Sequence, residues 1–140
     1  MIETPFDNQL SYVLAAAHRM VSQSVTKRLK NQGIQIEAWR IMECLEANDQ
    51  MTMGDLARIA LLNPPTLSKM VDRMVSDGLV HRQIAQRDQR QVNLLLTDLG
   101  RSRMLKVRQE VEAHDRDLIG HIDADERRQL IALLKQLTPG

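Results

Sequence analysis

The sequence predicts a mainly α-helical protein with one small β-hairpin, and three patterns point to this fold class. Apolar residues recur every three or four positions near both ends of the 140-residue chain, as on one face of a long helix. Between these ends, residues 52–77 carry the start and stop signals of two short helices joined by a turn. Two β-prone runs then bound the polar stretch 86–91. A helix-turn-helix followed by a hairpin is a winged helix.

Length and composition favour a single globular domain, which we place at residues 1–140. The only cysteine, Cys44, leaves no disulfide framework and no cysteine zinc cage, and it fits a reducing cytoplasm. No apolar run approaches the ~20 residues of a membrane span. The first ten residues lack the apolar segment of a secretory signal. We therefore expect a cytoplasmic protein.

The basic residues are unevenly distributed, although the net charge is only +1. Residues 51–103 hold eight Lys and Arg against five Asp and Glu, whereas acidic residues exceed basic ones by one in both 1–50 and 104–140. The basic middle third is compatible with a nucleic-acid surface. A solvated face with no partner would show the same weak bias.

Two helices are expected before the helix-turn-helix. The first covers about residues 10–29 and is ended by Gly33. The second runs from about Glu37 to Ala47 on an apolar face made of Ala38, Ile41, Met42 and Leu45.

The helix-turn-helix itself is indicated by its caps. Thr52 opens the first of the two helices, with Asp55 as its capping-box partner. Asn63, followed directly by proline, has the form of an N-cap for the second helix. That helix should end at Asp77, because Gly78 suits the left-handed position after a helix.

The second of these helices has a face suited to contact DNA. Its buried stripe is predicted to be Leu67, Met70, Val71, Met74 and Val75. The residues expected to face the major groove are Pro65, Thr66, Ser68, Lys69 and Arg73. Lys69 and Arg73 are four positions apart, so both can reach phosphate or guanine from one side of the helix. The alternative is an ordinary amphipathic surface helix.

The hairpin predicts a second contact. Its strands are expected before Gln86 and over Val92–Thr97, so Arg87, Asp88 and Arg90 would lie at its tip. A narrow minor groove attracts inserted arginine side chains, and Asp88 can hold the guanidinium of Arg90. The alternative is a solvated ion pair that contributes almost nothing.

The combined order of motifs resembles the MarR family of bacterial transcription regulators. The likeness covers about residues 10–138 and rests on the segment GDLARIALLNPPTLSKMVDRMVSDGLVHRQIAQRDQRQVNLLLTDLGR, including Asp88-x-Arg90. Gln35 departs from the family, which often has Ser or Thr at that helix cap. The resemblance implies a winged-helix DNA-binding module at about 36–100. It also implies that Arg90 enters the minor groove, that Asp88 holds it, and that the outer face of the second helix reads the major groove.

The resemblance further implies a homodimer formed by the end helices, about 8–32 and 101–138. The long helix after Thr97 has the apolar-rich seam Met104, Val107, Val111, His114, Leu118 and His121, and the last helix, capped by Asp123 and Glu126, carries Leu130, Leu133, Leu134 and Leu137. Two such chains would place their reading helices one DNA turn apart, ~34 Å, on a palindrome. The alternative is a monomer whose end helices cover its own core.

A small aromatic or phenolic anion is expected as the effector, since the family binds such ligands between the dimer helices and the DNA module. The residues proposed to line that site are Tyr12, His18, Arg19, Trp39 and Arg40, and Trp39 could equally be a core residue. The function predicted is thus a homodimeric repressor that its ligand releases from DNA.

Other functions have less support. The acidic neighbours of Cys44 should raise its pKa, so a buried thiol is favoured over a redox sensor. His114 and His121 are ~10 Å apart along a helix, too far apart for one metal ion, and polar contacts at the dimer interface fit them better. No nucleophile–base pair, phosphate loop or metal-spaced cluster indicates an enzyme or a cofactor. A winged helix that binds protein or RNA remains the second alternative.

Overall fold

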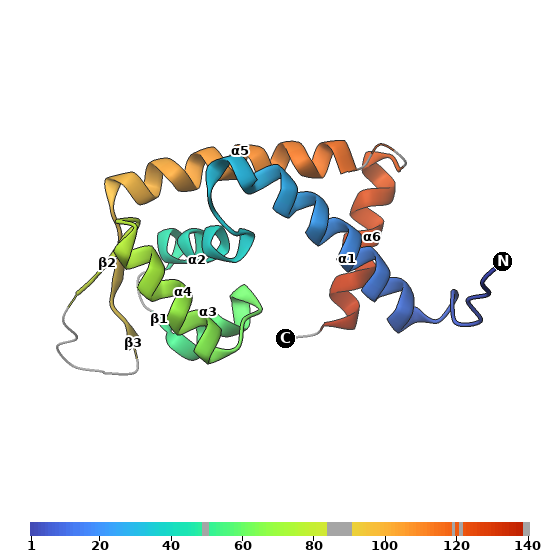
Figure 1. Ribbon diagram of the computed structural model, residues 1–140, viewed down its shortest axis with the longest axis horizontal. Helices are drawn as coiled ribbons and strands as arrows, with labels where there is room; N and C mark the ends of the chain where they lie inside the picture. The colour runs from blue at the N-terminus through green and yellow to red at the C-terminus, as the bar shows by residue number, and fades with distance from the viewer. Residues whose placement is uncertain (49–50, 84–90, 119, 121, 139–140) are drawn as a thin grey trace.

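The computed structural model describes residues 1–48, 51–83, 91–118, 120 and 122–138. The chain forms α1 (Leu10–Leu29), the 3-10 helix η1 (Lys30–Gln32), α2 (Ile36–Ala47), β1 (Met51–Thr52), α3 (Met53–Ala60), α4 (Pro64–Ser76), β2 (Val80–Arg82), β3 (Gln91–Val92), β4 (Leu94–Leu96), α5 (Asp98–Leu118) and α6 (Ala124–Leu137). Helix α5 runs along one edge of the molecule (Figure 1). Helices α2–α4 and the strands lie below its first half, and α1 and α6 lie below its other end.

The main core lies between α2, α3 and α4 and is completed by α5. Ile41 of α2, Leu56 of α3 and Leu67 of α4 are fully buried and belong to one cluster, which reaches Met104 of α5. A smaller cluster joins Val25 and Leu29 of α1 to Val107 of α5, with Trp39 packed against both clusters. Because the buried side chains of α4 belong to the first cluster, α4 is packed against α2, α3 and α5.

The predicted caps of the helix-turn-helix are confirmed. The Asp55 N–H donates to Thr52 Oγ1 at 2.9 Å, and the Thr66 N–H donates to Asn63 Oδ1 at 2.9 Å. The turn between α3 and α4 passes through Leu61, whose φ of 61° is left-handed. Gly78, with φ of 77°, ends α4 as expected from its freedom to adopt that conformation. These local signals set where α4 begins and ends.

The two strands at the base of the predicted hairpin are present and paired. The second strand is divided into two pieces, which the sequence did not indicate. β2 pairs antiparallel with β4, with Val80 opposite Leu96 and Arg82 opposite Leu94. The run Val92–Thr97, expected to be one strand, is interrupted, and Gln91–Val92 instead pairs with β1. A two-residue strand such as β1 has no sequence pattern of its own, and Thr52 also serves as the cap of α3. Ile84 and Ala85, expected in the first strand, lie outside the described residues.

The start of α5 is fixed against the end of α4. Thr97 Oγ1 accepts from the Gly100 N–H at 2.9 Å and donates to the Gly78 carbonyl at 2.6 Å. Gly100 is buried against the backbone of Leu79, with no room for a side chain. These contacts connect the end of α4 to the long helix α5.

Polar side chains join α1 to α5. Arg28 donates to Glu110 at 3.0 Å and to Asp117 at 2.7 Å, and the pKa of Asp117 is lowered chiefly by that hydrogen bond. His114 is buried and lies 2.8 Å from Ser24 Oγ. Within the chain His114 reaches Ser24 because α1 packs directly on α5, and its predicted place at a dimer interface stays a prediction. His121 lies outside the described residues.

Candidate nucleic-acid interface

Helix α4 presents the face that the sequence predicted. Leu67, Val71 and Met74 are buried in the core, while Met70 and Val75 of the expected stripe are half-buried. On the other side, all five residues predicted to face the major groove are exposed: Pro65, Thr66, Ser68, Lys69 and Arg73. The capped N-terminus of α4 lies at the end of the helix remote from α5 (Figure 1). The helix therefore offers small residues first and cations further along, all free to meet a ligand from outside.

The exposed residues of α4 fall on two sides of the helix. Thr66, Lys69 and Arg73 line a cleft that faces α1. On another side, Asp72 forms an ion pair with Arg82 of β2. This pair joins α4 to strand β2 of the hairpin. Sequence reasoning missed Arg82, because a cation ten residues from Asp72 has no helical spacing to reveal the contact.

The predicted wing-tip residues Arg87, Asp88 and Arg90 lie outside the described residues. Their role therefore stays a prediction. The structure does describe the base of the hairpin, which is the β2–β4 pair. Just beyond β2, the Gln83 N–H donates to the Asn93 carbonyl at 2.7 Å.

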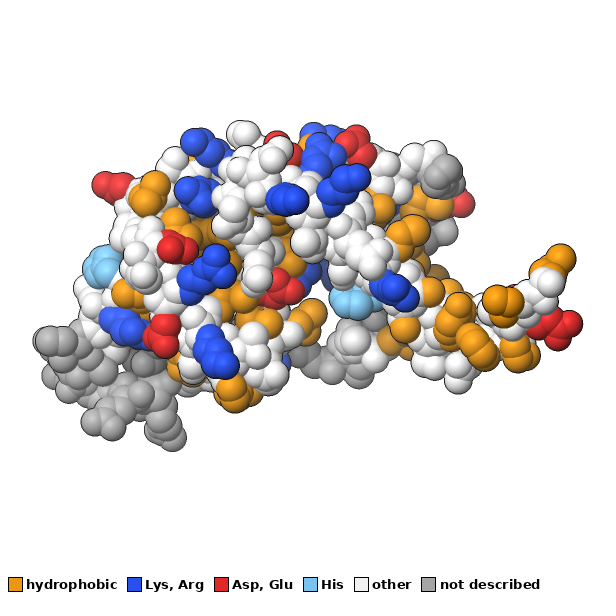
Figure 2. Space-filling model, viewed as in Figure 1, with side chains coloured by type: hydrophobic (Ala, Val, Ile, Leu, Met, Phe, Trp, Pro, Cys, Tyr) orange, Lys and Arg blue, Asp and Glu red, His pale blue; other side chains and the backbone are white. Residues whose placement is uncertain are grey.

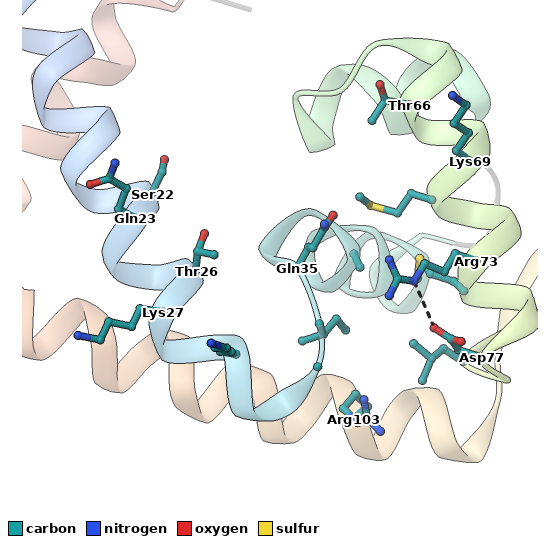
Figure 3. A pocket seen from close by; sticks show the side chains of 17 residues that line it. Ser22, Gln23, Thr26, Lys27, Gln35, Thr66, Lys69, Arg73, Asp77 and Arg103 are labelled. Atoms are coloured by element: carbon teal, nitrogen blue, oxygen red, sulfur yellow. Dashed lines mark ion pairs between the residues drawn. The ribbon is translucent and has the colours of Figure 1, made fainter.

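The cleft beside α4 has a volume of about 1100 Å³. One wall is α4, and the other is formed by the C-terminal half of α1, by η1 and by Arg103 of α5 (Figure 3). Apolar residues from α2, α4 and the segments that flank them form the floor: Ile34, Ala38, Met70, Met74 and Leu79. Basic side chains line it from both walls: Lys27, Lys30, Lys69, Arg73 and Arg103. Asp77 is the one acidic residue among the lining, and its Oδ2 lies 3.9 Å from Arg73 Nε.

None of the five residues predicted for the ligand site lines this cleft. Tyr12 lies near the N-terminus, with its ring centroid 4.7 Å from that of Phe6, and His18 lies 3.4 Å from Ser22 Oγ. Arg19 is exposed and Arg40 is half-buried. The structure does not bring these side chains together, because α1 carries the first three of them away from α2.

Trp39 packs in the core rather than in the cleft. It contacts both apolar clusters, as the core interpretation of this residue requires. Its Nε1 is buried and has no hydrogen-bond partner among the described residues.

The remaining candidates for chemistry give no further site. Burial, and secondarily the charge of Glu43, raise the pKa of the Cys44 thiol, in the direction expected from its neighbours. Within the part of the chain that the structure describes, no three His, Cys, Asp or Glu side chains are grouped so as to hold a metal ion. No described helix combines the length and apolar character needed to cross a membrane.

The capped, exposed helix α4 and the β2–β4 strand pair beside it together form a winged-helix module. Residues 34–92 match the sequence model of the MarR family. The homoprotocatechuate degradative operon repressor of Escherichia coli is 27% identical to this chain, over 92% of this chain and 87% of the relative. Residues 34–92 therefore carry a MarR family domain, and the relatives and solved structures similar to this chain include transcription regulators of that family.

Solved structures agree with this assignment. A MarR family transcriptional regulator from Silicibacter pomeroyi is 28% identical and superposes with a TM-score of 0.79, covering 98% of this chain and 100% of that one. The transcriptional repressor CouR, solved with a 23-mer DNA duplex, superposes with a TM-score of 0.90 over 99% of both chains. At 21% identity, that second likeness shows the fold alone.

Proposed function

We propose that this chain is a homodimeric transcriptional repressor that binds a palindromic operator and leaves it when a small organic anion occupies the cleft. The observation that carries the proposal is the exposed face of α4, with Thr66, Ser68, Lys69 and Arg73 free of the core. The E. coli relative, named as the repressor of a homoprotocatechuate degradative operon, supports both repression and an aromatic acid as the class of effector.

DNA reading follows from the chemistry of α4. The small side chains near its N-terminus let the helix approach base edges closely, and its N-terminal N–H groups favour a phosphate. Lys69 and Arg73 are exposed cations one turn apart, suited to phosphate or guanine. Arg82 neutralises Asp72 on the side toward the hairpin, which reduces repulsion between that carboxylate and the DNA backbone.

Apolar residues that remain exposed in a single chain support the formation of a dimer. In α6 no described residue is buried, and the exposed leucines are Leu130, Leu133, Leu134 and Leu137. Hydrophobic side chains also gather over the N-terminal half of α1, at the right of Figure 2, and these include Leu10, Val13 and Leu14. An exposed apolar surface of this extent marks an interaction site, and two interlocking copies would bury it.

The two alternatives from the sequence make different predictions. A redox sensor needs a thiol with a lowered pKa, and the raised pKa of Cys44 opposes that role. A winged helix used for protein binding would show no preference among duplexes. Selection of tightly bound sequences from random duplexes tests the proposal, which expects a recurring palindrome.

Lys69→Ala is expected to weaken binding to the selected palindrome. If Lys69 meets a phosphate, the log–log slope of affinity against salt should become less steep by about 0.9, because one fewer counterion is released. If it reads a base, the preferred sequence should change at one position. Lys106→Ala, an exposed lysine of α5 outside the proposed interface, serves as the matched control and should leave both quantities unchanged. Equal behaviour of the two variants would show that α4 does not contact DNA through Lys69.

Leu133→Glu is expected to dissociate the dimer. In a single copy the Leu133 side chain is 60% exposed, so a lone protein should tolerate the change within ~0.5 kcal/mol. In a dimer that buries this leucine, the substitution removes ~1.5–3 kcal/mol of stabilisation from apolar burial and places an unpaired charge in the interface. The dissociation constant of the dimer should therefore rise at least about tenfold. Sedimentation equilibrium measures this constant. Leu95→Glu changes an exposed leucine of β4, outside the end helices, and should leave the dimer intact. A wild-type monomer would contradict the assembly.

A further inference from the structure

The cleft beside α4 has cations on two opposite walls. Lys69 and Arg73 belong to the α4 wall, whereas Lys30 of η1 and Arg103 of α5 belong to the other. Figure 3 shows Lys69 and Arg73 on the α4 ribbon and Arg103 on the α5 ribbon below them, near the end of α4 that carries Asp77. Lys27 also lines the cleft, but its side chain extends away from α4 in this view. The positive charge that could attract an anion is therefore divided between two groups, one on α4 and one on η1 and α5.

Arg103 is a preorganised anchor. Its Nη1 donates to the Gln32 carbonyl at 3.0 Å, and the residue is half-buried. A guanidinium has five N–H donors, so this one bond leaves donors for a carboxylate. Because the side chain is already held, binding an anion there costs less rotamer entropy than binding to a free lysine.

The surface between the two walls is apolar apart from Gln35. Ala38, Met74 and Leu79 are buried residues whose side chains reach the floor, and Met70 and Ile34 extend it. A flat hydrocarbon or aromatic body gains free energy on such a floor, whereas a charged group placed over it would lose its hydration. The volume of about 1100 Å³ is larger than a single-ring acid needs.

We propose that the ligand of this cleft is an elongated organic dianion, with an apolar body on the floor and one anionic group at each wall. A monoanion of the same shape can pair with only one group of cations. A dianion can pair with Lys69 and Arg73 at one end and with Lys30 and Arg103 at the other.

The same arrangement gives a direct route to regulation, and this part rests on the proposed function. Lys69 and Arg73 belong both to the cleft and to the face of α4 proposed to meet DNA. A carboxylate bound to Lys69 and Arg73 would occupy the cations that a DNA phosphate would otherwise contact. Ligand and DNA should therefore compete for these two side chains, and each should weaken the binding of the other by the same factor.

The test compares matched probes on the full chain without DNA. We would measure binding of 4,4′-biphenyldicarboxylate and biphenyl-4-carboxylate by calorimetry, with terephthalate and benzoate as a shorter pair. At least one dicarboxylate is expected to bind about tenfold or more tighter than its monoacid, since one charged hydrogen-bonded contact is gained. Equal affinities within both pairs, or no binding by either dicarboxylate, would overturn the proposal.

Variants then assign the second anchor. Lys30→Met and Arg103→Gln should each reduce the dicarboxylate advantage several-fold, whereas Lys106→Met, a change of an exposed lysine of α5 that does not line the cleft, should retain it. If Arg103→Gln does not fold, Lys30→Met is the deciding variant, because Lys30 is exposed. An unchanged advantage in Lys30→Met would contradict the placement.

A separate measurement of whether the dicarboxylate displaces DNA distinguishes failure of the ligand proposal from failure of the proposed repressor function. If the protein binds no duplex, the proposed repressor function fails while the calorimetric ratio still decides the ligand class. If the dicarboxylate binds but a stable ternary complex forms with undiminished DNA affinity, the shared-cation route is wrong.

Discussion

Gly100→Ala is expected to destabilise the fold by about 3 kcal/mol or more, or to prevent folding. A Cβ at Gly100 would lie 2.9 Å from the carbonyl carbon of Leu79 and closer still to its oxygen. That oxygen already accepts from the Thr97 N–H at 3.1 Å, and the Leu79 N–H donates to Met74 at 3.0 Å. The backbone at Leu79 therefore cannot move aside without breaking the link between α4, the strands and α5.

Urea unfolding followed by circular dichroism measures this effect. Gly54→Ala is the matched control, because a Cβ there meets only Thr52 Oγ1 at an ordinary 3.7 Å. In helix α3 that change should stabilise the chain by about 0.5–1 kcal/mol. Near-equal stability of the Gly100→Ala variant and the wild type would mean that α5 is not packed against Leu79 as described.

Arg90→Ala is expected to cause the largest loss of DNA affinity, about 1–3 kcal/mol or roughly tenfold and more, while leaving folding and dimerisation intact. The stretch 86–91 has no apolar residue, so its arginines have no packing role to lose. The proposed role is insertion into a narrow, A·T-rich minor groove, whose negative potential attracts the guanidinium. Competition binding on the selected palindrome measures it.

The Asp88→Ala variant distinguishes two roles for Asp88 in the stretch 86–91: a simple charge near DNA, or a residue that holds Arg90 in place. Removing a carboxylate near phosphate should tighten binding if only charge matters. If Asp88 holds Arg90 in place, binding should weaken instead, since a free arginine costs ~0.5–1.5 kcal/mol to order. In a double-mutant cycle, the loss should vanish once Arg90 is alanine. Tighter binding of the single variant would contradict the holding role.

Local signals explain what the sequence could predict. The caps at Thr52, Asn63 and Asp123 and the left-handed Gly78 each depend on a few neighbouring residues, and all are present in the structure. The buried and exposed faces of α4 follow in the same way from helical spacing, so spacing alone assigns the residues proposed to meet DNA to the exposed face.

What the sequence missed depends on contacts between distant segments. β1 pairs with β3 across about forty residues, and Asp72 meets Arg82 from another element. The cleft depends on how α1, α5 and α4 are placed, so Lys30 and Arg103 both line it although no sequence pattern connects them. The predicted ligand residues were assigned by resemblance alone; they do not line this cleft, and their role stays a prediction.

The central claim is that two copies of this chain read one palindromic duplex through α4. The most direct measurement is the affinity for the selected palindrome and for a scrambled duplex over a range of salt concentrations, with the stoichiometry of each complex. We predict two chains per palindrome, tighter binding than to the scrambled sequence, and a log–log slope of about −0.9 for each phosphate contacted. Binding that is independent of salt, or equal for the two duplexes, would contradict the claim.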